Sequence, residues 1–138
     1  MKNYIYITIF LTLISCQNDD TNIDNSSFNP PDWLIGTWDN SYETAFLKTY
    51  IITNNNVILE YQNNDLLDYT EFINKSSDNT LIEHEITENK YRYTIRNKLP
   101  DGEISDYEVS FVKVSNNELK LYITIPTSMT SSTYYKRN

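Results

Sequence analysis

Cysteine, histidine and glycine are scarce in this chain of 138 residues. It contains one cysteine, Cys16, one histidine, His84, and two glycines. A single cysteine cannot form a disulfide within the chain, so a folded domain must be held by its core and its hydrogen bonds alone. The residues that build the usual zinc, thiol and phosphate-loop sites are also lacking. We therefore expect no metal, no cofactor and no enzymatic activity.

Positive charge is limited as well. The chain has 11 Lys and Arg residues against 19 Asp and Glu residues, which gives a net charge of −8. A surface of this sign repels phosphate groups, so we expect neither nucleic acid nor anionic lipid as a partner held by charge. The length leaves room for one domain with one hydrophobic core.

The first residues are typical of an export signal. Lys2 precedes an apolar run from Tyr4 to Ile14, which at eleven residues is too short to span a bilayer and has the length found in secretory signal peptides. The run ends in Leu-Ile-Ser-Cys, which resembles the lipobox of bacterial lipoproteins. This resemblance implies a signal peptide over residues 1–15 and acylation of Cys16, with palmitate among the acyl chains, as a membrane anchor. The alternative is a leader that ends in these residues by chance.

The next residues predict a flexible tether over 16–29. They are rich in Asn, Asp, Ser and Thr and have little apolar surface to bury. Gln17-Asn18-Asp19-Asp20 also resembles the short acidic signal that directs Bacteroidota lipoproteins to the cell surface. We therefore expect a lipid-anchored protein of the outer membrane, exposed at the cell surface, with a periplasm-facing anchor as the alternative.

The composition and the apolar pattern of residues 30–138 predict an all-β domain. Tyr is abundant at 12 residues, and short segments of alternating polarity are separated by Asn-rich turns. A short helical turn, with Asn29 as its cap, precedes them. Short connections favour an up-and-down antiparallel barrel of about eight strands. The expected strands are 35–40, 44–53, 57–62, 69–75, 80–87, 90–97, 106–114, 119–125 and 133–136.

The clearest predicted hairpin runs from Leu81 to Asn97 around a two-residue turn at Glu88-Asn89. Its alternation places one set of side chains on the inner face, namely Ile82, His84, Ile86, Tyr91, Tyr93 and Ile95. The hairpin around Asn116-Asn117 requires a bulge near Phe111 and Val112, because its apolar face changes parity there. Between Leu47 and Ile52 both faces of the strand carry apolar residues, so the pattern does not decide which face points inward.

The inner face of this hairpin supplies the candidate ligand-binding residues, which are His84, Tyr91, Tyr93 and Tyr107. The alternative is that they are core residues, with His84 satisfied by a hydrogen bond to Tyr93. Glu83 and Glu85 alternate with His84 along the strand, so the three side chains cannot share a metal ion. In a chain this short, the large tyrosines are expected to meet across the interior and to fill it, or nearly so.

Gly36 and Trp38 form a Gly-x-Trp sequence at the start of the first strand, and Tyr134 to Arg137 form a closing strand at the C-terminus. Together with the series of antiparallel strands joined by short turns, they resemble the lipocalin-like domains of Bacteroidota lipoproteins over Trp33 to Arg137. The resemblance implies that the tryptophan packs at a closed barrel end beneath a cation, for which Lys136 and Arg137 are the candidates.

Two functions follow as expectations. The resemblance implies a cell-envelope lipoprotein whose barrel binds a small apolar or amphipathic ligand. The alternative is a protein-interaction module, either an envelope-anchored inhibitor or an accessory subunit of a surface complex, with a filled barrel and no ligand. A cavity would favour the first function and a filled interior the second.

Overall fold

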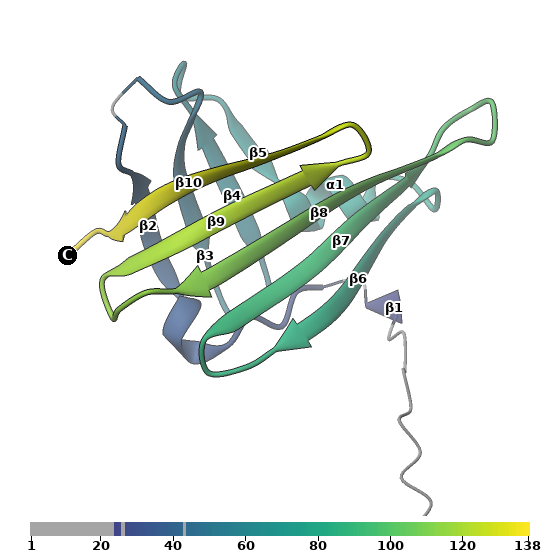
Figure 1. The fold of residues 1–138 in the computed structure, drawn as a ribbon. Coiled ribbons are helices and arrows are strands. Elements are labelled where there is room, and N and C mark those ends of the chain that lie inside the picture. Colours follow the sequence, from purple (N-terminus) through teal and green to yellow (C-terminus); the bar gives the residue numbers. More distant parts are fainter. Residues whose placement is uncertain (1–23, 26, 43) are drawn as a thin grey trace, which may run out of the picture.

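The structure, a computed structural model, describes residues 24, 25, 27–42 and 44–138 (Figure 1). The described residues form one antiparallel sheet in the order β1-β6-β7-β8-β9-β10-β2-β3-β4-β5. Its strands are β1 (Asp24–Asn25), β2 (Gly36–Asn40), β3 (Leu47–Ile52), β4 (Val57–Tyr61), β5 (Leu66–Asp68), β6 (Asn79–Ile86), β7 (Lys90–Lys98), β8 (Ile104–Lys113), β9 (Glu118–Ile125) and β10 (Ser128–Lys136). A 3₁₀ helix, η1 (Asp32–Leu34), and an α-helix, α1 (Tyr69–Asn74), complete the fold.

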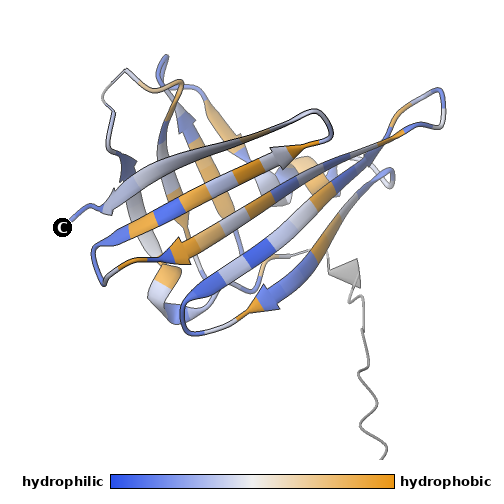
Figure 2. Ribbon diagram, in the orientation of Figure 1, coloured by the Kyte–Doolittle hydropathy of each residue, from blue (hydrophilic) through white to orange (hydrophobic). Residues whose placement is uncertain are grey.

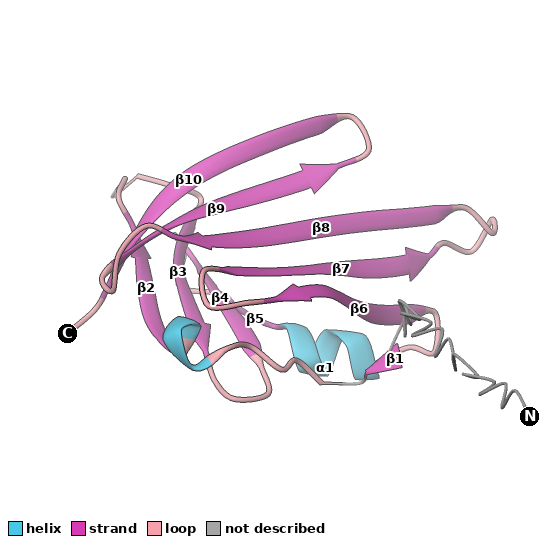
Figure 3. Ribbon diagram, turned by 60° about the horizontal axis from the view of Figure 1, so that its bottom comes forward, coloured by secondary structure: helices cyan, strands magenta, loops and turns pink. Residues whose placement is uncertain are grey.

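The sheet curls into a half-barrel, as Figures 1 and 3 show. Helix α1 lies between β5 and β6, on the side where the two ends of the sheet approach each other (Figure 3). The predicted all-β class is confirmed, but the prediction of a strand over 69–75 is wrong. The Asp68 side chain accepts a hydrogen bond from the backbone N–H of Glu71 at 2.9 Å and caps a helix, on which Tyr69 and Ile73 are buried one turn apart.

Hydrophobic and hydrophilic residues alternate along several strands (Figure 2), and the buried apolar side chains form one core cluster. The Tyr50 ring on β3 packs edge-on against Phe111 on β8 and Tyr134 on β10, with centroids 5.4 and 5.3 Å apart. Tyr91 and Tyr93 on β7 add two further rings, 5.6 Å apart. Aromatic rings therefore meet across the middle of the half-barrel.

A β-bulge in β6 divides the predicted hairpin into a correct and an incorrect half. Ile86 pairs with Tyr91 and Glu85 pairs with Arg92, as expected, but Glu83 then pairs with Tyr93. The extra residue is His84, which is exposed and lies 2.8 Å through Nε2 from the Oγ1 atom of Thr94. The prediction that His84 faces the interior is therefore wrong.

The same bulge corrects two isoleucines of the predicted inner face. Beyond the bulge the parity of β6 is reversed, so Leu81 is buried and pairs with Ile95. Ile82 pairs with Thr94 and is only partly buried, and Ile86 at the strand end is exposed. Alternation cannot reveal a bulge that is placed between two polar or weakly apolar positions.

A second bulge settles the inner face of β3. Leu47 pairs with Tyr61, whereas Thr49 pairs with Glu60, so Lys48 is the extra residue. Tyr50 and Ile52 are buried in the core, and Leu47 packs against the same core. Leu47 before the bulge and Tyr50 and Ile52 after it therefore share the inner face despite their different parity, whereas Ile51 is not part of the core.

The β8–β9 hairpin forms without the predicted bulge. Phe111 pairs with Leu121, and the ladder runs without a shift from Glu108 to Lys113. The additional residue lies in the turn, where the backbone N–H groups of Val114 and Ser115 donate to Glu118 O. The bulge expected near Phe111 is therefore replaced by a longer turn.

The fold begins earlier than residue 30. Asp24 and Asn25 pair with Ile82 and Leu81 at the edge of β6, and Phe28 is buried with its ring 4.9 Å from that of Tyr93. The predicted helical turn is present as η1, although Pro31 and not Asn29 takes the cap position. The predicted signal peptide and Cys16 lie outside the described residues. None of the helices in the described ranges is long and apolar enough to cross a membrane.

Candidate functional site

The end of the half-barrel next to η1, called the closed end below, is built around Trp38. Its side chain is 1% exposed, and its indole N–H donates to Leu34 O on η1 at 2.7 Å. The Lys136 ammonium lies over the ring, with Nζ 5.3 Å from its centroid. Gly36 has a φ of 139°, and a Cβ atom there would come within 2.9 Å of Lys136 Cε. Glycine therefore provides both the backbone conformation and the space that let the lysine cover the tryptophan.

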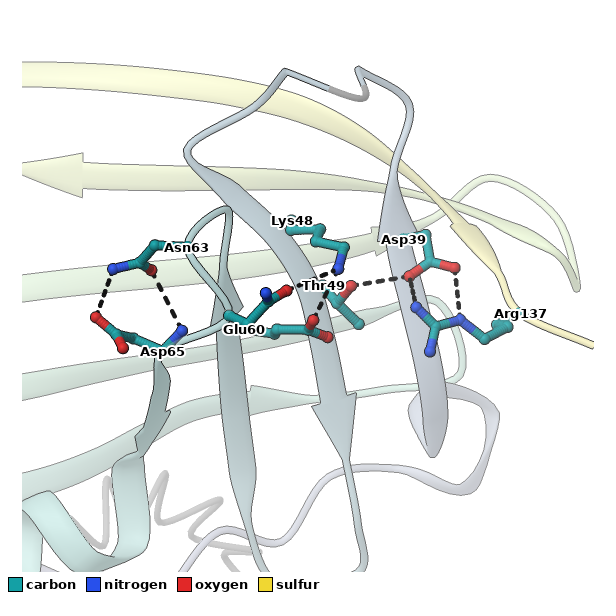
Figure 4. Close-up of polar contacts among 8 residues, drawn as sticks. Asp39, Lys48, Thr49, Glu60, Asn63, Asp65 and Arg137 are labelled. Atoms are coloured by element: carbon teal, nitrogen blue, oxygen red, sulfur yellow. Dashed lines mark hydrogen bonds and ion pairs between the residues drawn. The ribbon is translucent and has the colours of Figure 1, made fainter.

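Arg137, the other candidate for this cation, binds Asp39 instead. Its guanidinium donates two hydrogen bonds to the carboxylate at 2.8 and 2.6 Å, and Thr49 Oγ1 donates a third at 2.9 Å (Figure 4). These donors, Arg137 above all, lower the pKa of Asp39. The pair therefore stabilises the fold above the ordinary pKa of aspartate, and this contribution is lost as the pH falls through the lowered value. The contribution is small, because both side chains are partly exposed to water.

Neighbouring contacts extend this polar network over the outer face of β2–β4. Lys48, the bulged residue, pairs with Glu60 at 2.8 Å, and its ammonium also lies 3.4 Å from the side-chain oxygen of Asn64 (Figure 4). These residues are on the surface opposite the aromatic interior. They hold the first strands together and do not form a pocket.

The predicted tyrosines are brought together, whereas His84 lies on the outside. Tyr91 and Tyr93 are fully buried, and the Tyr91 hydroxyl donates to the Glu83 carboxylate, which also accepts from Asn29 N–H. Tyr107 is partly buried, with its ring 6.4 Å from that of Tyr69. Burial raises the pKa of all four phenols.

Two of the buried phenols, Tyr50 and Tyr93, have no hydrogen-bond partner for their hydroxyl groups among the described residues. Burial raises their pKa well above 10, and the neighbouring tyrosines raise it further. These hydroxyls are polar groups in an apolar, aromatic surrounding. They are costly to bury without a partner.

A groove of about 340 Å³ lies at the open end of the half-barrel, where the β2–β3 loop faces β9 and β10. Its apolar surface comes from Phe46, Leu47, Leu121 and Ile123, with Ala45 beside them. Its polar residues are Asn40, Thr130, Ser131, Ser132 and Tyr134. A groove of this size, apolar on one side and rich in hydroxyl groups on the other, fits a small amphipathic molecule.

Strand pairing explains why one side of this groove is apolar and the other carries hydroxyl groups. Ile123 pairs with Thr130 and Leu121 pairs with Ser132, so each apolar residue of β9 lies beside a hydroxyl residue of β10. Below them the Tyr134 hydroxyl lies 3.1 Å from Asn40 Nδ2, which also donates to Leu47 O at 3.0 Å. Burial raises the pKa of Tyr134 to about 12, so this phenol stays neutral at physiological pH.

The predicted strand 119–125 contains Leu121 and Ile123, but sequence reasoning missed the β10 side of the groove. The predicted last strand began at Thr133, while β10 begins at Ser128. The missed signal is the alternation of Thr130, Ser132 and Tyr134, which continues the inner face of Tyr134 toward the open end. Its small polar residues gave no apolar pattern to detect.

Two further hollows lie on the outside of the fold. One, about 630 Å³, is lined by residues of the closed end that include Trp33, Ile86 and Lys113, and the Trp33 indole N–H donates to Thr87 O at 2.9 Å within it. The other, about 490 Å³, follows α1 and is lined almost wholly by polar residues. Within the described ranges, no three Asp, Glu, His or Cys side chains gather closely enough to hold a metal ion.

Comparison of the chain with protein families, with curated proteins and with solved structures finds no match.

Proposed function

We propose that this chain is a lipid-anchored protein of the outer membrane, of the lipocalin-like type, that binds a small apolar or amphipathic molecule at the open end of its half-barrel. The observation that carries this proposal is the groove of about 340 Å³ beside Phe46 and Ile123. The packed rings of Tyr50, Phe111 and Tyr134 below it speak against a deep ligand cavity, so the proposed site is confined to this groove. The ligand would therefore lie at the mouth and not deep inside.

The residues around the groove suggest how such a ligand would be held. Leu121 and Ile123 would contact its apolar part, and the hydroxyl groups of Thr130 and Ser132 would bind a polar group. His84, which we expected to supply a polar contact, is on the outer surface of β6 and is not part of this site. Tyr91 and Tyr93 would support the groove from below and would not touch the ligand.

Binding can be tested with the neutral fluorescent probe N-phenyl-1-naphthylamine. We expect the purified chain to bind it saturably, with one probe for each chain. Replacement of Ile123 with tryptophan should fill the groove and abolish this binding. Ile86→Trp, which adds the same side chain at the closed end, should leave the probe affinity unchanged. Probe binding that survives Ile123→Trp unaltered would rule out the groove as the binding site.

The lipid anchor can be tested by replacing Cys16 with serine. Because the acyl chains are proposed to attach at this sulfur, the variant should lose its stable membrane attachment and appear in soluble fractions. Fractionation of cells that express the two forms measures the difference. A processed Cys16→Ser protein that stays in the membrane fraction would contradict the anchor without affecting the groove proposal.

A further inference from the structure

Most of the large apolar side chains that are exposed in the described part of the chain lie at hairpin connections of one end of the sheet. In an antiparallel meander successive hairpins alternate between two ends, so the β2–β3, β4–β5, β7–β8 and β9–β10 connections share the open end. Ten large apolar side chains are exposed among the described residues, and seven lie at these four connections. They are Tyr42, Phe46, Leu66, Leu99, Ile104, Ile125 and Met129.

Exposure varies among the seven: Leu99 and Ile125 are 36% and 41% exposed, no more than the apolar residues of the closed end, and four others are much more exposed. Phe46, Met129, Tyr42 and Leu66 are 66–73% exposed, whereas Ile86 and Val114 at the closed end are 45% and 51% exposed. The long strands β7–β10 carry their two hairpin tips well away from the short strands β2–β4 (Figures 1 and 3). Phe46 and Leu66 therefore belong to the β2–β5 side of this end, and Met129 and Ile104 belong to the β7–β10 side. Large exposed apolar patches in soluble folds mark interaction surfaces.

The charges at the same end are mainly negative. Asp65 on the β4–β5 connection and Asp101 and Glu103 on the β7–β8 connection are exposed. The cations nearby are Lys98 at the end of β7 and Lys48 at the start of β3, which pairs with Glu60. The whole chain carries a net charge of −8. An apolar surface with acidic residues around it is complementary to a partner with apolar and basic residues, and it disfavours an anionic membrane.

We propose that the open end docks a cationic amphipathic segment of another polypeptide, such as a helix with leucines on one face and lysines on the other. The apolar face would cover Leu66, Met129 and their neighbours, and the basic face would meet Asp65, Asp101 and Glu103. This inference goes beyond the proposed small ligand, because Leu66 and Met129 do not line the groove.

The test uses the purified full chain and a fluorescein-labelled amphipathic helix of leucine and lysine, with fluorescence anisotropy as the measurement. A matched peptide has glutamate in place of every lysine. We expect saturable binding of the lysine peptide, binding at least roughly tenfold weaker for the glutamate peptide, and a loss of affinity as the salt concentration rises. Equal binding of the two peptides would overturn the proposal.

Two double variants locate the surface. Leu66→Ser with Met129→Ser should lower the affinity for the lysine peptide by roughly tenfold or more, since two apolar contacts are removed. Ile86→Ser with Val114→Ser makes the same change at the closed end and should alter the affinity less than twofold. An equal loss in the two variants would overturn the assignment to the open end.

Two more measurements separate this inference from its alternatives. The Leu66→Ser, Met129→Ser variant should still bind N-phenyl-1-naphthylamine, because its groove is intact. Loss of peptide binding can therefore be distinguished from loss of small-ligand binding. Phosphatidylcholine vesicles should not sediment the purified chain when its lipid anchor is removed by Cys16→Ser. Sedimentation that requires Leu66 and Met129 would identify a membrane as the partner and overturn the proposal.

Discussion

Replacement of Trp38 with alanine should lower the free energy of unfolding by about 3–5 kcal/mol, the range found for large aromatic side chains in packed cores. Three interactions are lost together. The side chain is buried at the closed end, its indole N–H donates to Leu34 O, and its ring lies beneath the Lys136 ammonium. The substitution would leave a cavity next to η1, and η1 would lose its hydrogen bond with β2.

Trp33 provides the matched control for this effect. It also donates an indole hydrogen bond, to Thr87 O, and also lies near a lysine, Lys113. Because Trp33 is only partly buried, Trp33→Ala should cost less than Trp38→Ala. Urea denaturation of the two variants measures both costs, provided that the slopes of the transitions agree. A larger loss for Trp33→Ala would mean that η1 and not Trp38 is the main support of the closed end.

Tyr91→Phe and Tyr93→Phe should change stability in opposite directions. Both side chains are 0% exposed on the same strand, and phenylalanine keeps the ring. Loss of the Tyr91 hydroxyl removes a donor to the Glu83 carboxylate and should destabilise the fold by about 1.5–3 kcal/mol. Loss of the Tyr93 hydroxyl removes a buried polar group without a partner and should stabilise it by up to about 1–3 kcal/mol.

The two tyrosine variants are each other's control, because they remove the same atom from neighbouring inward positions. Denaturation midpoints of the variants and of the unchanged chain give the sign of each effect. If Tyr93→Phe were as destabilising as Tyr91→Phe, the Tyr93 hydroxyl would have to make a favourable hydrogen bond, and the aromatic interior would contain a polar partner for it.

The sequence predicts the elements of this fold better than it predicts which faces they turn inward. The strands 36–40, 57–61, 79–86 and 90–98 are expected within a few residues, because their apolar pattern and Asn-rich turns are clear. Residues 69–74 were expected to be a strand, since Tyr69, Phe72 and Ile73 give no decisive period. The side chain of Asp68 caps a helix there and so favours α1 over a strand. The Asp-x-x-Glu spacing of Asp68 and Glu71, which is typical of such a cap, was present in the sequence.

The candidate site was less predictable than the fold for two physical reasons. Bulges at Lys48 and His84 change the parity within a strand, and no local residue type requires them. As a result His84 was placed inside, although Tyr91 and Tyr93 were placed correctly. The groove itself depends on small polar residues of β10, such as Thr130 and Ser132, whose role appears only when they are paired with β9.

Strand β10 is the last strand in the chain and also lies in the middle of the sheet, between β9 and β2. It joins the group β6–β9 to the group β2–β5, and its partner Trp38 is about a hundred residues earlier in the sequence. This pairing closes a very long loop, which makes the folding transition slow in comparison with local hairpins. The two groups can form separate hairpins, but they cannot join until Tyr134–Lys136 pairs with β2. Until that pairing forms, the two groups lack the central seam that makes them one sheet.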